Sequence, residues 1–178
     1  MTSSSPSAVV DAAADAVAES DVHDFDFLPG TWKIHHRRLK GRLVGSTEWE
    51  EFEGTSEARL TMGGAGNMDD NIIPAPAGTY RAMTIRSFDP ETNQWQIWWL
   101  DARFPKGPLD PPMVGSFKDG IGTFYADDTF NGQPIRVRFL WSDISDTTCR
   151  WEQAFSPDGG ETWEINWVMT STRLAWPA

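Results

Sequence analysis

The sequence has a single cysteine, Cys149, so no disulfide bond can form within the chain. It has no run of about 18 apolar residues, which excludes a helix that spans a membrane. Its N-terminal segment lacks a basic stretch, and Asp11 and Asp15 interrupt the apolar residues there, so the segment does not resemble a signal peptide. Together these absences predict a cytoplasmic protein in a reducing compartment.

Positive charge and tyrosine are also scarce. The chain has 15 Lys and Arg against 26 Asp and Glu, which gives a formal net charge of −11. An acidic chain repels phosphate backbones and anionic lipid surfaces, so neither nucleic acid nor a membrane is an expected partner. Two Tyr stand against ten Trp and ten Phe. This density of Trp predicts large aromatic faces that are buried or line a cavity.

The 178 residues suffice for one domain with a substantial core. Residues 1–6 read as a Ser-rich tail, and apolar residues at near-helical spacing predict a short helix that ends by residue 20. Residues 21–178 are predicted to form a single β-barrel domain. No pattern for a long helix interrupts this region, so parallel strand pairing is not expected.

From Pro29-Gly30 onward, short segments of β-type alternation are joined by turns. The expected strands number about ten, and they cover residues 31–39, 49–52, 57–62, 67–73, 80–88, 95–100, 113–117, 121–126, 135–141, 149–155 and 162–173. Sequential antiparallel strands in this number usually close into an up-and-down barrel, because closure removes exposed edges. The Pro-rich loop over residues 104–112 is the expected portal loop.

The start of the first strand, Phe27-Leu-Pro-Gly-Thr-Trp-Lys33, resembles the opening of lipocalins and fatty-acid-binding proteins. In those families a Gly-x-Trp opens the first strand, and the Trp closes the barrel base against an Arg of the last strand. The resemblance assigns these two positions to Trp32 and Arg173, and it implies a guanidinium packed over an indole. The acidic-aromatic residues 24–28 resemble an uncharacterised bacterial branch of this calycin superfamily, for which no uniform activity is implied. The Arg-x-Tyr carboxylate clamp of fatty-acid-binding proteins is not evident.

A second local motif lies near the C-terminus. Ser156-Pro-Asp-Gly-Gly-Glu-Thr-Trp163 fits the Ser-x-Asp-x-Gly-x-x-Trp hairpin known as the Asp box. In that hairpin the Ser and Asp side chains satisfy turn backbone groups, and the Trp packs beneath. One copy cannot build a propeller, so the motif predicts a tight turn between the last two strands.

Two titratable residues are candidates for chemistry. His35 and His36 point to opposite faces of one strand, and parity with Trp32 places His36 inside. A lone interior His can act as an acid or base or ligate haem iron, or it can simply be hydrogen-bonded. Glu152 is a second acid–base candidate, although a cross-strand ion pair with an Arg would explain it without catalysis.

The sequence therefore predicts an all-β, antiparallel, lipocalin-like up-and-down barrel that binds a small apolar or aromatic molecule. The residues expected to contact it are His36, Arg38, Trp99, Arg138 and Trp167. One alternative is a cofactor-independent isomerase, hydratase or cyclase that uses His36 or Glu152. The other is a haem-binding barrel with His36 as axial ligand. No metal site is expected from the spacing of Cys and His, and the many Trp are compatible with a homodimer.

Overall fold

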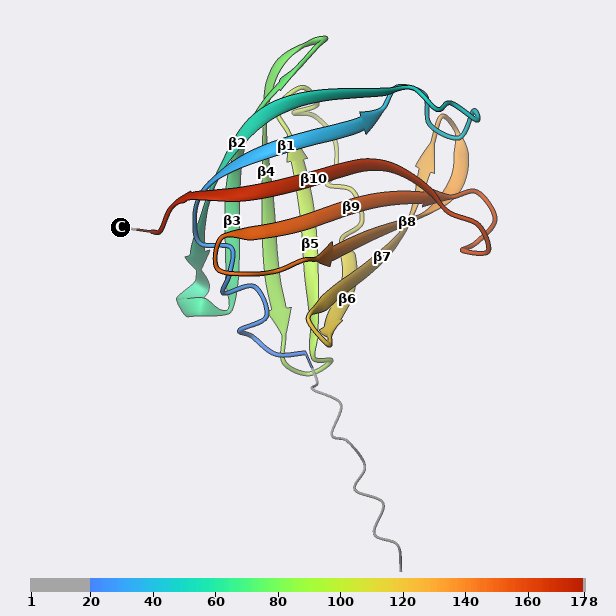
Figure 1. The fold of residues 1–178 in the computed structure, drawn as a ribbon. Helices are drawn as coiled ribbons and strands as arrows, with labels where there is room; N and C mark the ends of the chain where they lie inside the picture. Colours follow the sequence, from blue (N-terminus) through green and yellow to red (C-terminus); the bar gives the residue numbers. More distant parts are fainter. Residues whose placement is uncertain (1–19, 178) are drawn as a thin grey trace, which may run out of the picture.

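A computed structural model describes residues 20–177 of the chain. Ten antiparallel strands close into a barrel, in which each strand pairs with its neighbours in sequence and the last pairs with the first (Figure 1). The strands are β1 (Gly30–Leu39), β2 (Trp49–Thr61), β3 (Gly66–Ala75), β4 (Gly78–Asp89), β5 (Gln94–Asp101), β6 (Met113–Lys118), β7 (Ile121–Phe130), β8 (Gln133–Ser142), β9 (Thr148–Ser156) and β10 (Glu164–Ala175). The predicted all-β, antiparallel barrel is confirmed, and each strand pairs with two neighbours.

The expected strands over residues 49–52 and 57–62 are one continuous strand, β2. Gly54, which suggested a break, lies inside this strand opposite Ile34 of β1. A Cβ atom at Gly54 would lie 2.7 Å from Nε2 of His36, so the glycine makes room for the imidazole. Gly54 therefore allows close packing of His36 against β2 and does not mark a turn.

The predicted tail over residues 1–6 and the predicted helix over residues 7–20 lie outside the described residues, apart from Ser20. Over residues 20–177 the helical structure is limited to a single 3-10 turn, η1 (Met62–Gly64), between β2 and β3. Within the same range no helix is long and apolar enough to cross a membrane.

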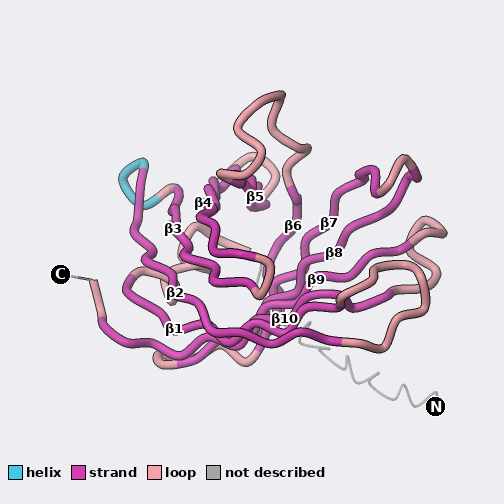
Figure 2. The backbone as a smooth tube through the Cα atoms, turned by 90° about the horizontal axis from the view of Figure 1, so that it is seen from above, coloured by secondary structure: helices cyan, strands magenta, loops and turns pink. Residues whose placement is uncertain are grey.

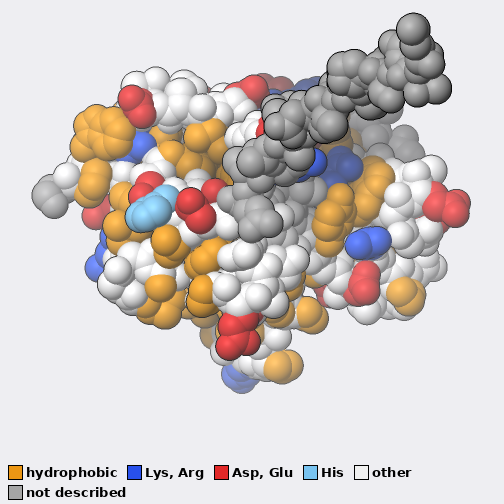
Figure 3. Space-filling model, turned by 90° about the horizontal axis from the view of Figure 1, so that it is seen from below, with side chains coloured by type: hydrophobic (Ala, Val, Ile, Leu, Met, Phe, Trp, Pro, Cys, Tyr) orange, Lys and Arg blue, Asp and Glu red, His pale blue; other side chains and the backbone are white. Residues whose placement is uncertain are grey.

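Residues 20–29 cross one end of the barrel, which we call the base. Phe25 is the centre of an aromatic cluster there, with edge-on contacts to Trp95, Phe117 and Trp141 at ring-centroid distances of 5.0, 4.9 and 5.7 Å. On the outer surface of the base, acidic, basic and hydrophobic side chains are interspersed (Figure 3).

Trp32 and Arg173 face each other across β1 and β10 at this base. The guanidinium carbon of Arg173 lies 4.1 Å from the centroid of the Trp32 ring. Arg173 also donates hydrogen bonds to the carbonyl oxygens of Phe27 and Pro29, and Trp32 Nε1 donates to Leu28 O at 2.7 Å. The pair therefore fastens the segment before β1 to the last strand.

The opposite end, which we call the mouth, carries the loops after β1, β3, β5, β7 and β9 (Figure 2). The Asp-box motif forms the loop from β9 to β10. Ser156 Oγ accepts from Gly160 N at 2.8 Å, Asp158 Oδ1 accepts from Thr162 N at 2.9 Å, and Trp163 Nε1 donates to Gly160 O at 3.0 Å. These contacts satisfy turn backbone groups, which is a structural role.

Candidate functional site

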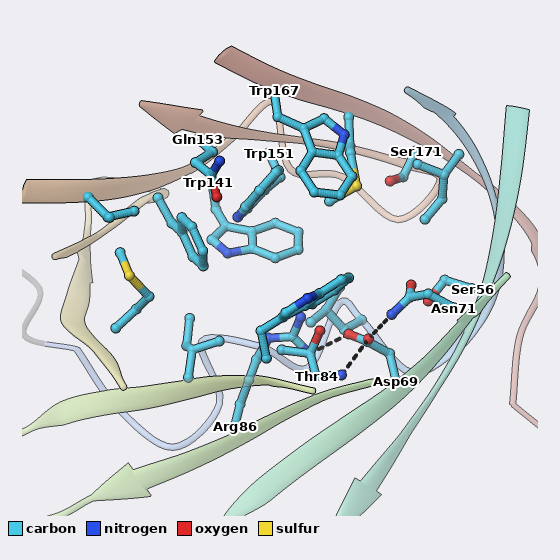
Figure 4. A pocket seen from close by; sticks show the side chains of 18 of the residues that line it. Ser56, Asp69, Asn71, Thr84, Arg86, Trp141, Trp151, Gln153, Trp167 and Ser171 are labelled. Atoms are coloured by element: carbon cyan, nitrogen blue, oxygen red, sulfur yellow. Dashed lines mark hydrogen bonds and ion pairs between the residues drawn. The ribbon is translucent and has the colours of Figure 1, made fainter. Parts of the chain in front are cut away.

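The barrel surrounds a cavity of about 190 Å³ that extends from Leu28 and Trp32 at the base to Asp110 and Pro111 in the loop after β5. Its two sides differ in chemistry (Figure 4). On one side β8, β9 and β10 contribute the aromatic wall, which consists of Phe139, Trp141, Trp151 and Trp167. On the other side β2, β3 and β4 contribute the polar wall, which consists of Ser56, Asp69, Asn71, Thr84 and Arg86.

A buried ion pair organises the polar wall. Arg86 Nη1 lies 2.7 Å from Asp69 Oδ2, and the two residues are only 3% and 6% exposed. Asp69 Oδ1 accepts further hydrogen bonds from Thr84 N at 3.2 Å and from the Asn71 side-chain amide. A buried ion pair carries a large desolvation cost, which these added hydrogen bonds help to offset. The two opposite charges also leave this wall with little net charge.

Perpendicular ring contacts hold the aromatic wall. The centroids of Trp151 and Trp167 lie 5.8 Å apart with an interplanar angle of 85°, and those of Trp99 and Trp167 lie 6.3 Å apart at 81°. Phe139 meets Trp151 at 4.7 Å and 66°. Edge-to-face geometry is a preferred arrangement for aromatic pairs. The wall is therefore a well-ordered apolar surface.

A β-bulge brings Trp167 into this wall. Ile165 pairs with Ala154 and Trp167 pairs with Gln153, so Asn166 between them has no partner residue on β9. As a result Ile165 is 39% exposed, whereas Trp167 is 9% exposed. Strict alternation would place Ile165 and Trp167 on the same face of β10. The bulge adds one residue between them, so they lie on opposite faces.

His36 connects the two sides of the cavity. Its ring stacks on Phe52 at 4.7 Å and 14°, and its Nδ1 accepts a hydrogen bond from Trp167 Nε1 at 3.2 Å. Because an indole N–H can only donate, Nδ1 is unprotonated and the ring proton lies on Nε2. Burial, with a smaller contribution from the Arg38 cation, lowers the pKa of His36 to about 4. His36 is therefore neutral at pH 7.

Four buried side-chain nitrogens have no hydrogen-bond partner within the described part of the chain. They are His36 Nε2, Asn67 Nδ2, Arg86 Nε and Trp141 Nε1. His36, Arg86 and Trp141 line the cavity. Each of these atoms is a hydrogen-bond donor. Three of the residues that line the cavity therefore carry a buried donor that no protein acceptor uses.

The candidate ligand-binding residues from the sequence are only partly brought together. His36, Trp99 and Trp167 line the cavity. Arg38 is not among the lining residues and lies nearer the mouth. There it forms an ion pair with Glu50 at 2.6 Å and donates to the Tyr80 hydroxyl at 3.3 Å.

The other two candidates, Arg138 and Glu152, are not among the residues that line the cavity. On β8 and β9 the odd-numbered residues line the cavity, so both of these residues point outward. The Arg138 guanidinium carbon lies 4.7 Å from the Trp163 ring centroid, and Glu152 pairs with Arg150 on the same strand. Alternation separates the two faces of a strand but does not identify the inner one.

The polar wall was missed from the sequence. In β3 the inward residues Asn67, Asp69 and Asn71 alternate with Met68, Asp70 and Ile72, so polar residues occur on both faces. The strand registers of the structure identify this wall. Trp32, already expected inside, pairs with Ser56, which in turn pairs with Asn71. Residues directly opposite each other in a sheet share a face, so this chain of pairs leads to the polar wall.

The described side chains do not fit a haem group. His36 Nδ1 is occupied by Trp167, and Nε2 lies over Gly54, where an added carbon would already be at 2.7 Å. A tetrapyrrole is also several times larger than the aromatic ligands that a cavity of roughly this size accepts. For metal ions, residues 20–177 contain no group of three or more His, Cys, Asp or Glu residues arranged to bind one.

The sequence matches no known protein-family model, and no curated protein is significantly similar to it. Fold and site therefore define the class. The protein is a closed, ten-stranded, antiparallel β-barrel, consistent with a calycin-like barrel, with a lined internal cavity.

Proposed function

We propose that this protein binds a small, mainly apolar molecule of one or two rings inside a lipocalin-like barrel. The observation that carries the proposal is the cavity itself, in which an ordered aromatic wall faces a hydrogen-bonded polar wall. A cavity of about 150 Å³ suffices for benzene. The 190 Å³ found here suits a ligand of slightly larger size.

The two walls support distinct parts of this function. Burial of apolar ligand surface against Trp151 and Trp167 provides affinity at roughly 25 cal/mol per Å². A few fixed polar groups, such as those around Asp69, orient the ligand and exclude others. This division is typical of small-molecule sites.

Cofactor-independent catalysis is less well supported by the described side chains. Glu152 points outward and is paired with Arg150. His36 faces the cavity, but a pKa of about 4 makes it a weak base at neutral pH. Reversible binding requires neither residue to exchange a proton.

We also propose that the barrel is a member of the lipocalin-like, bacterial branch of the calycins, because Arg173 packs over Trp32 at the base. A cytoplasmic location is proposed from the lone cysteine, which is buried and free. The homodimer stays a prediction.

Calorimetric titration with indane tests the proposal. The wild-type protein is expected to bind one indane per chain. Ala126→Phe, which fills the cavity from β7, should abolish this binding. Thr123→Phe, on the outer face of the same strand, should leave it unchanged. The proposal would be refuted if the wild-type protein did not bind indane, or if Ala126→Phe bound indane as tightly as the wild-type protein does.

A further inference from the structure

We infer that the ligand is uncharged and presents a hydrogen-bond acceptor, such as the carbonyl of a ketone, lactone or amide, to Trp141 Nε1 and Arg86 Nε near the base of the cavity. The inference rests on the proposed function and names the class of ligand.

Two buried donors of the cavity lining lack a protein acceptor. The nearest carboxylate and amide oxygens already accept other hydrogen bonds: Asp69 accepts from Arg86, Thr84 N and Asn71, and Asn67 Oδ1 accepts from Arg86 at 2.9 Å. Trp141 Nε1 and Arg86 Nε, in contrast, have no protein acceptor. A buried donor without an acceptor is costly. A ligand acceptor that reaches these two donors would offset that cost.

Trp141 and Arg86 lie close together near the base of the cavity. The guanidinium carbon of Arg86 lies 5.5 Å from the Trp141 ring centroid, and both side chains contact the Phe25 ring at the base. Trp141 comes from β8 and Arg86 from β4, and Figure 4 shows their side chains converging on the cavity from opposite walls. A carbonyl oxygen has two lone pairs and can accept from two donors at once. One carbonyl therefore matches both donors.

The charges of the lining residues favour an uncharged ligand. The charged lining residues are three carboxylates, Asp69, Asp110 and Asp128, and one guanidinium, Arg86. His36 and Cys149 also line the cavity and are neutral, because burial lowers the pKa of His36 to about 4 and raises the pKa of Cys149 to about 11. Arg86 is already paired with Asp69. An anionic ligand would meet two uncompensated carboxylates and no free cation. Desolvation of its charge would add to that cost. A neutral acceptor avoids both penalties.

The positions of these side chains set the orientation of the ligand. Its acceptor enters first and lies near the base, beside Trp141 and Arg86. Its rings lie against Trp151, Trp167 and Trp99, which extend the apolar lining toward the mouth.

Three probes of one shape test the inference: indane, 1-indanone and indane-1-carboxylate. In a cavity that offers no hydrogen bond, the carbonyl of 1-indanone would weaken binding about tenfold relative to indane, because it loses its hydration. We expect instead that the wild-type protein binds 1-indanone at least as tightly as indane, and binds the carboxylate at least about tenfold more weakly. Calorimetric titration measures all three.

Trp141→Phe removes the indole N–H and keeps an aromatic ring. It should weaken 1-indanone about tenfold relative to indane, so that the order of the two probes reverses. Trp49→Phe, on the outer face of β2 beside Arg37, is the matched control and should leave the order unchanged.

The possible failures are distinct. A wild-type protein that binds indane tenfold more tightly than 1-indanone would overturn the inference and leave the proposed function standing. An unchanged preference in a folded Trp141→Phe variant would overturn the assignment of the donor. Binding of no probe would refute both proposals. The comparison of probes on the wild-type protein needs no variant and is independent of its folding.

Discussion

The aromatic and polar walls of the cavity are built by different interactions. In the aromatic wall, contacts between rings such as Trp151 and Trp167 are numerous and individually weak, so the loss of one contact is shared among neighbours. In the polar wall, a single carboxylate, Asp69, receives Arg86, Thr84 N and Asn71. The polar wall is therefore held by a few individual hydrogen-bonding atoms, whereas the aromatic wall is held by the sum of many ring contacts.

The strongest test of this difference is Asp69→Ala. The change leaves Arg86 buried without its carboxylate, and it should lower the free energy of unfolding by about 3–5 kcal/mol. Asp70→Ala, which breaks the exposed pair with Arg81 on the outer face of the same strand, should cost less than about 1 kcal/mol. Urea unfolding measures both. Equal losses would show that the polar wall has no special sensitivity.

A second test uses pH and His36, the residue between the walls. The pKa of His36 is lowered from 6.5 to about 4 in the folded chain, so the unfolded chain takes up this proton first as the pH falls. The stability contributed by the neutral imidazole is therefore complete above about pH 6.5 and is lost progressively toward pH 4, by about 3 kcal/mol in total.

Urea unfolding across this pH range should show a weaker dependence for His36→Phe than for the wild-type protein. Carboxylates titrate in the same range, and comparing the two proteins subtracts their common contribution. Parallel pH profiles would contradict the assignment of the buried, neutral imidazole.

The smallest expected effect concerns the hydrogen bond from Trp167 Nε1 to His36 Nδ1. Trp167→Phe keeps an aromatic ring and should reduce the free energy of unfolding by about 1–2 kcal/mol. Nitrogen NMR of the wild-type protein should show the proton of His36 on Nε2, and the Nδ1 signal should shift in the variant. Trp49→Phe serves as the control for both measurements. A proton on Nδ1 in the wild-type protein would contradict the geometry.

The number of strands and their antiparallel order could be predicted because local signals mark them. Turns such as Asp119-Gly120 and Asn131-Gly132 adopt positive φ angles where the sequence has Asp-Gly and Asn-Gly pairs. Barrel closure followed from the length of the meander. The split of β2 at Gly54 was wrong, because the space that this glycine provides is filled by a side chain from another strand.

The sequence predicts which side chains face the cavity only on a strand that contains a residue of known orientation. His36 was placed inside by its parity with Trp32, which is on the same strand. No such reference exists for β8 and β9, so the sequence does not determine which face carries Arg138 and Glu152. The bulge at Asn166 arises from pairing with β9 and leaves no local trace. The polar wall depends on registers across three strands, which a single sequence does not reveal.

Pairing of the first and last strands has a consequence for the connectivity of the chain. Thr31 at the start of β1 lies opposite Ala175 at the end of β10, so the barrel has no natural beginning in space. A circular permutant could link the two ends of the chain and open it in the Asp119-Gly120 turn. It would keep all ten strand pairs, and only β6 and β7 would no longer be joined by a turn. The order of the strands along the gene is one of several that encode the same ring.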